Sequence, residues 1–179
     1  MKHILSFVMI FMATVALATS VLPESVEQLT NLSSVVVEAQ AVQSWAQWNE
    51  AHTLIFTYTR FSVSRTLKGQ PQGSVTVRQL GGTLGNIRQK VSGVRAWRTG
   101  EQTVLFLRPS EAQDGTLAVT GLMQGNFLLH RANDGSVTVS NGVPEASRYD
   151  TRANSFSEFH GSSLTLANLE LRVLKAAKQ

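Results

Sequence analysis

Strand patterns separated by turn residues run from residue 35 to residue 139 with no helix between them, and this order constrains the fold more than any other feature. In the first pattern Val35, Val37, Ala39 and Ala41 share one parity, the period of two that a half-buried strand shows. Parallel strands need long crossover connections, usually helices, so the order excludes βαβ topology and predicts an antiparallel sheet. The predicted strands cover residues 35–48, 53–67, 75–80, 102–107, 116–122, 125–130 and 136–139.

The second of these strands changes its apolar phase. Leu54, Phe56 and Tyr58 share one parity, whereas Phe61 and Val63 share the other. Such a change inside a continuous strand indicates a β-bulge or a strong bend, and long bent strands are what a small closed barrel needs. The predicted fold class is therefore mainly β (α+β): a small antiparallel barrel of the OB type or, as the alternative, an open curved sheet.

Two helices are predicted at the ends of this sheet. Residues 23–31 form a short helix in which Val26 and Leu29 belong to one apolar stripe. Residues 163–177 form a longer amphipathic helix that packs on the sheet. Because no linker and no internal repeat interrupts the pattern, residues 19–179 are predicted to be a single β-rich domain.

The first 18 residues have the layout of a secretory signal peptide. Lys2 provides a basic start, residues 4–16 carry no charge, and residues 16–18 (Ala-Leu-Ala) form a small-x-small cleavage site. The apolar run is shorter than the ~20 residues of a spanning helix, and no later segment approaches that length, so no membrane span is expected after cleavage. The chain has no cysteine and needs no oxidative folding, so it is expected to be secreted or periplasmic in a bacterium.

No pattern in the chain predicts catalysis, a metal or a cofactor. His52, His130 and His160 lie far apart in the sequence and lack the paired spacing of a metal site. Without cysteine there is no thiolate nucleophile or thiolate ligand. The glycines of residues 81–85 lack the ending of a phosphate loop and are predicted to form a tight turn at a barrel corner. The protein is expected to be non-enzymatic; the alternative is a hydrolase that places one histidine beside an acid in a cleft.

The middle of the chain is strongly basic. Residues 51–100 hold eight Lys and Arg residues and no acid, whereas the whole chain has 12 acids. With interleaved aromatic residues on an OB-like barrel, this is the general recipe for single-stranded nucleic acid, but export favours an anionic polysaccharide, a membrane surface or an acidic protein. Alternatively, strand parity sends the charges to different faces and the aromatic rings into the core. The candidate binding residues are Arg88, Lys90, Arg95, Trp97 and Arg98, with Trp45 and Trp48.

Several segments resemble a family of small exported bacterial proteins. The resemblance covers roughly residues 25–130 and is carried by residues 67–69 (Leu-Lys-Gly), 75–82 (VTVRQLGG), 100–107 (GEQTVLFL) and 121–125 (GLMQG). These motifs are strand, turn and corner signals rather than catalytic ones. The resemblance implies an exported protein whose partner is an exported metalloprotease.

The order of short helix, long bent strands, Leu-Lys-Gly turn and terminal helix is also similar to the netrin-like OB barrel of the tissue inhibitors of metalloproteinases. That resemblance implies a protein-binding or inhibitory role. In those inhibitors an N-terminal cysteine chelates the catalytic zinc, and this chain has no cysteine, so neither that mechanism nor its residues carry over. The predicted function is an exported protein-interaction module; the alternative is a binder of anionic polysaccharide or membrane surface through residues 60–98.

Overall fold

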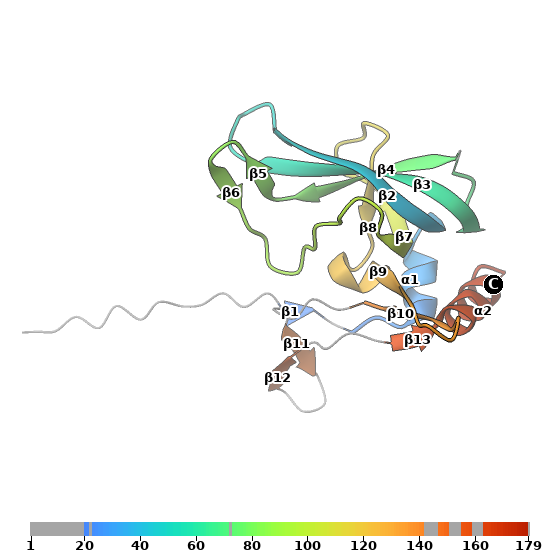
Figure 1. Cartoon of the computed structure of the whole chain (residues 1–179). Coiled ribbons are helices and arrows are strands. Elements are labelled where there is room, and N and C mark those ends of the chain that lie inside the picture. The colour runs from blue at the N-terminus through green and yellow to red at the C-terminus, as the bar shows by residue number, and fades with distance from the viewer. Residues whose placement is uncertain are drawn as a thin grey trace, which may run out of the picture.

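The computed structural model describes residues 20–21, 23–71, 73–141, 147–150, 155–158 and 163–178 (Figure 1). The predicted signal peptide and His160 lie outside the described residues. The helices are α1 (Val26–Leu32), α2 (Leu166–Ala176) and the short 3-10 helix η1 (Leu122–Gly125). The strands are β1 (Ser20–Val21), β2 (Val35–Trp48), β3 (Ile55–Lys68), β4 (Ser74–Leu80), β5 (Gly82–Leu84), β6 (Ile87–Gln89), β7 (Gln102–Pro109), β8 (Leu117–Val119), β9 (Asn126–Arg131), β10 (Val137–Ser140), β11 (Ser147–Asp150), β12 (Ser155–Glu158) and β13 (Ser163–Thr165).

The main sheet is curved and partly closes on itself, as the fold class predicted. Its eight strands run in the order β13-β10-β9-β7-β2-β3-β4-β8, and β8 also pairs with β7, which closes a ring through β2, β3 and β4. The ring is an OB-like barrel. One pairing differs from the antiparallel expectation: β8 lies parallel to β4 through a single residue pair, Val77 and Leu117, because a ring that closes on an odd number of strands cannot be antiparallel throughout.

The sequence predicted a bulge or strong bend between Tyr58 and Phe61, but this stretch of β3 pairs regularly with β4, and the apolar phase changes because Phe56 and Tyr58 lie on the opposite face of the sheet from Phe61. The bulges lie elsewhere between β2 and β3. Their register shifts at three places, Val36/Val37, Glu38/Ala39 and Ala41/Gln43. The last of these changes the phase of β2, so that Ser44 faces the same side as Ala41. Beyond this point β2 pairs only with β3, while the same part of β3 pairs with β4, so an arm of three strands extends past β7.

Two cores lie on opposite faces of β7. Leu105 and Leu107 point into the barrel, whereas Val104 and Phe106 pack toward the two helices. All four side chains are fully buried, which explains the nearly continuous apolar run of this strand and confirms it as central. The helices therefore cover one side of the sheet and leave the arm and its hairpin, β5–β6, on the far side of the barrel (Figure 1).

The C-terminal helix begins later than residue 163. Residues 163–165 form β13, which pairs with β10, and the Thr165 hydroxyl accepts a hydrogen bond from the Asn168 amide as the N-cap of α2. Residues 163–165 therefore join the sheet and not the helix.

The strand predicted over 116–122 is also shorter than expected. It ends at Val119 as β8, because Gly121, with φ +63°, turns the chain into η1.

Candidate functional site

The fold divides the eight basic residues of the middle segment among several surfaces. Three of them serve the structure: the Lys68 ammonium donates to the Thr30 carbonyl at 2.7 Å, Arg95 pairs with Glu101 at 3.1 Å, and Arg65 bridges two carboxylates of β2 and α2. Much of the positive charge of residues 51–100 is therefore spread over different faces, which is the alternative predicted from the sequence.

Three of the sequence-predicted site residues are not brought together. Trp97 is only 5% exposed; its ring meets Phe61 edge-on in the barrel core and its indole N–H donates to Asn126. Arg98 is exposed in the turn that precedes β7. Trp48 lies at the end of β2, with its ring tilted against His52. Trp97 therefore belongs to the core. Arg98 and Trp48 lie apart from each other, in the turn before β7 and at the end of β2.

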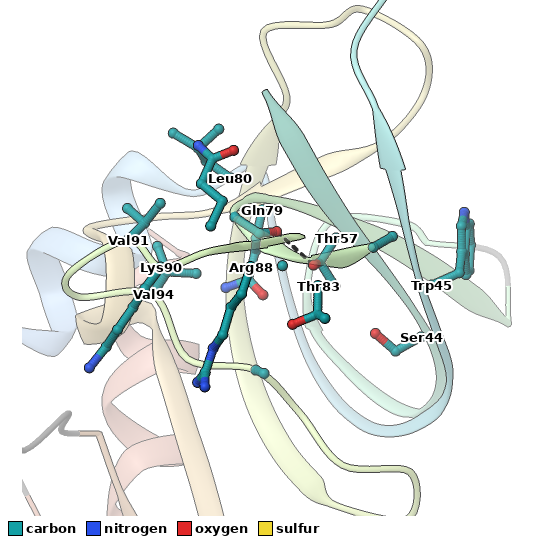
Figure 2. A pocket seen from close by; sticks show the side chains of 15 residues that line it. Ser44, Trp45, Thr57, Gln79, Leu80, Thr83, Arg88, Lys90, Val91 and Val94 are labelled. Carbon is teal, nitrogen blue, oxygen red and sulfur yellow. Dashed lines mark hydrogen bonds between the residues drawn. The ribbon is translucent and has the colours of Figure 1, made fainter. Parts of the chain in front are cut away.

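Arg88 and Lys90 come together at a cavity of about 500 Å³ beside the β5–β6 hairpin, which we call the hairpin pocket (Figure 2). Trp45 borders this cavity through β2, but in Figure 2 its ring points away from the two basic side chains. The ring of Trp45 belongs to a second surface on the opposite face of the same strands.

That second surface is a row of aromatic and arginine side chains across β2, β3 and β4. The register places Trp45 opposite Tyr58, and Tyr58 opposite Arg78, so these three side chains lie side by side across three strands. Phe56 and Arg60 stand two residues to either side of Tyr58 on the same face of β3. We call these five residues the arginine–aromatic face.

Stacking contacts and one hydrogen bond hold the side chains of the face together. The rings of Trp45 and Tyr58 are parallel within 11°, with centroids 5.6 Å apart. The Arg78 guanidinium lies 3.6 Å above the centroid of Phe56, and that of Arg60 lies 5.9 Å from the centroid of Trp45. The Arg78 Nε also donates to the Tyr58 hydroxyl at 3.2 Å. Each guanidinium is therefore held against a ring, one on each side of Tyr58.

Neither arginine of the face is paired with an acid among the described residues within ion-pair distance. Arg78 acts only at longer range on Asp114, an acid of the β7–β8 loop. Hydrogen bonds from Thr116 hold the pKa of the Asp114 carboxyl below its ordinary value, and the charge of Arg78 lowers this pKa further. The face thus carries two positive charges whose hydrogen-bonding edges are not used by carboxylates.

Trp45 is one of the candidate binding residues predicted from the sequence, but the other four residues of the face are not. A local signal was present, because Phe56, Tyr58 and Arg60 alternate at a spacing of two and must share a face of one strand. The partners on β2 and β4 could not be found in the same way, since the bulge at residue 42 shifts the register between β2 and β3.

The histidines that the structure describes form no metal site. His130 hydrogen-bonds Ser140 at 2.8 Å on the exposed surface of β9 and β10, and His52 lies in the β2–β3 turn. Among the described residues there is no group of three or more His, Cys, Asp or Glu side chains that could hold a metal ion. Over the same part of the chain, no helix is both long and apolar enough to cross a membrane.

No protein-family model matches the chain, and no curated protein is significantly similar to it.

Proposed function

We propose that this protein is an exported, non-enzymatic binding domain that holds an acidic polysaccharide on its arginine–aromatic face. The observation that carries the proposal is the pair of guanidinium groups stacked on aromatic rings without an acidic partner. The apolar run and small-x-small site of residues 1–18 support export.

The stacking favours recognition by charge. A guanidinium presents planar donors that match carboxylate and sulfate oxygens, and stacking on a ring leaves the edge of the group facing outward. Because Phe56 and Trp45 restrict the two arginine side chains, less rotamer entropy is lost when an anion binds. The amides of Gln43 and Gln47 flank Trp45 on the same face of β2 and can bond to hydroxyl groups.

The same geometry disfavours single-stranded nucleic acid. Stacking of bases requires open aromatic faces, but Trp45 is stacked on Tyr58 and Phe56 is covered by Arg78. A base would have to displace an arginine or separate two rings, whereas an acidic sugar chain can bind the existing surface through its charged groups.

The protein-interaction hypothesis, with an exported metalloprotease as partner, stays a prediction. This hypothesis requires an exposed apolar patch near Trp45, Trp48 and Trp97, but Trp97 is buried. Exposed large apolar side chains occur on many elements rather than in one place; among the described residues they are Leu32, Val42, Leu54, Ile87, Leu122, Leu171 and Leu174.

The test is retention on immobilised polygalacturonate, with its fully methyl-esterified form as the neutral counterpart. The mature protein should bind the charged polymer only, and the affinity should fall with salt concentration. The variant Arg60→Gln/Arg78→Gln should lose about tenfold in affinity, since exposed ion pairs contribute up to about 1 kcal/mol each and about 1.4 kcal/mol in total corresponds to a factor of ten. Melting curves establish that the variant is folded.

The matched control is Arg98→Gln/Lys178→Gln, which removes the same charge from exposed positions elsewhere. It should change the affinity less than twofold. An equal loss in both double variants would mean that net charge alone causes retention and would overturn the proposal. Tighter binding of an oligothymidylate than of polygalacturonate would replace it by the nucleic-acid alternative.

A further inference from the structure

Three hydrogen bonds between β3 and the segment of the β5–β6 hairpin border the hairpin pocket. The Gly81 amide donates to the Ile55 carbonyl at 2.7 Å, and the Ile55 amide donates to the Gln89 side chain at 2.8 Å. The Thr57 hydroxyl donates to the Gly81 carbonyl at 2.7 Å, as the dashed line in Figure 2 shows. These bonds fix the β5–β6 hairpin to the start of β3, so the cavity exists before any ligand arrives.

One wall of the pocket is cationic. Arg88 pairs with Thr83 across the hairpin, and Lys90, two residues after Arg88, continues the same side. In Figure 2 the side chains of Thr83, Arg88 and Lys90 lie in a row along the cavity. Arg88 is exposed and forms no ion pair among the described residues.

The rest of the lining combines a polar group with an apolar floor. Gln79 comes from the inner face of β4, opposite in parity to Arg78, and its amide has no hydrogen bond to any residue in the described ranges. Val91, Val94 and Ala96 supply aliphatic surface beneath it. The lining therefore offers positive charge, an amide and a hydroxyl, and a small apolar surface.

We propose that the hairpin pocket binds a sugar acid, a single hexuronate unit with a free carboxylate. Such a molecule needs all three features: the Arg88 guanidinium for its carboxylate, Gln79 and Thr83 for its ring hydroxyls, and the aliphatic floor for its C–H face. A cavity of about 500 Å³ lies within the usual range for small-molecule sites, about 300–1,000 Å³, and leaves room for one neighbouring sugar.

This site is separate from the arginine–aromatic face. Ser44 and Gln79 line the pocket, whereas their chain neighbours Trp45 and Arg78 place their side chains on the opposite face. The inference rests on the lining of the pocket and not on the proposed function, and either can fail without the other.

The experiment is a titration of the isotope-labelled mature protein with galacturonate, galactose and inorganic phosphate, followed by amide NMR shifts. Galacturonate should shift the amides of residues 79–91 with a Kd on the order of 1 mM, a typical affinity for so small a ligand. Galactose and phosphate should each bind at least fivefold more weakly. Equal binding of phosphate would reduce the site to a general anion contact, and equal binding of galactose would remove the role of Arg88; either result overturns the proposal.

Variants separate this site from the face. Arg88→Gln and Gln79→Leu should each weaken galacturonate at least fivefold, while Arg98→Gln and the Arg60→Gln/Arg78→Gln variant should not change its Kd. In turn, Arg88→Gln should leave retention on polygalacturonate within twofold. Loss of galacturonate binding in the face variant, or its persistence in both pocket variants, would contradict the assignment.

Discussion

At the scale of single residues, Gly82 shows how closely the hairpin approaches the barrel. Its φ is +145°, and a Cβ atom built there would lie 2.3 Å from the Thr57 hydroxyl and 3.3 Å from Ile55. A side chain at this position therefore meets both an unfavourable backbone conformation and a collision with the Thr57 hydroxyl. Close approach therefore requires glycine at Gly82, and an added Cβ at Gly81 would likewise meet the Gln89 carbonyl.

We predict that Gly82→Ala destabilises the protein and displaces the hairpin. The free energy of unfolding should fall by about 2 kcal/mol or more, the range for a substitution that combines strain with overpacking. Gly85→Ala is the control: its φ is +60°, but no atom lies within 4 Å of the added Cβ, so the loss should be about 1 kcal/mol. Urea unfolding measures both, and equal losses would show that the collision with Thr57 has no effect.

At the scale of elements, β3 is bound to the C-terminal helix by a shared charge cluster. The Arg65 guanidinium lies 2.7 Å from Glu170 of α2 and 3.7 Å from Glu38 of β2. Burial, together with the hydrogen bond and charge of Glu170, raises the pKa of Glu38 to about 7, although the charges of Arg65 and Arg131 oppose this shift. One guanidinium does not fully compensate two adjacent carboxylates.

This cluster predicts a stability that decreases as the pH rises. A carboxyl whose pKa is raised in the folded state binds its proton more tightly there, so its contribution is present below about pH 4.5 and is lost as the pH passes 7. The loss should be about 1–2 kcal/mol, less than the full shift implies because Arg65 is half-exposed. In the Glu38→Gln variant, urea titrations should show that the free energy of unfolding no longer falls by this amount between pH 5 and pH 8. If the variant keeps the full pH dependence of the wild type, other groups cause it.

At the scale of the whole molecule, the two ends of the described chain are joined. Arg172 of α2 makes two bonds to Glu27 of α1, Nε to Oε1 at 2.7 Å and Nη2 to Oε2 at 2.6 Å, across 145 residues. The helices pack on each other and share a core with Phe106 and Phe127 of the sheet. Both helices thus stabilise one side of the sheet and lie away from the β5–β6 hairpin (Figure 1).

We predict that Glu27→Gln lowers the free energy of unfolding at pH 7 by about 0.5–1 kcal/mol, the scale of a half-exposed bidentate pair. The hydrogen bonds from Arg172 lower the pKa of Glu27 to about 2. Its contribution is therefore present above about pH 4.5 and is lost as the pH falls toward 2. The wild type and the variant should have converging unfolding free energies in acid; a constant difference down to pH 2 would contradict the assignment.

The sequence by itself determined the local structure and the fold class. Apolar periods of two and of three to four are local properties, because they follow from how a strand or a helix turns its side chains. They were sufficient for the long strands, the central strand β7 and the two terminal helices. They also predicted a barrel, since phase changes in long strands indicate bending.

Only the tertiary structure decided which side chains meet. Trp45, Tyr58 and Arg78 become neighbours through the register of three strands, and one bulged residue reverses the face of everything that follows it. The same nonlocal pairing buried Trp97, paired Arg95 with Glu101 and separated Arg88 and Lys90 from Arg98. A run of eight basic residues can be counted from the sequence, but their division into structural pairs and binding surfaces depends on contacts between distant segments.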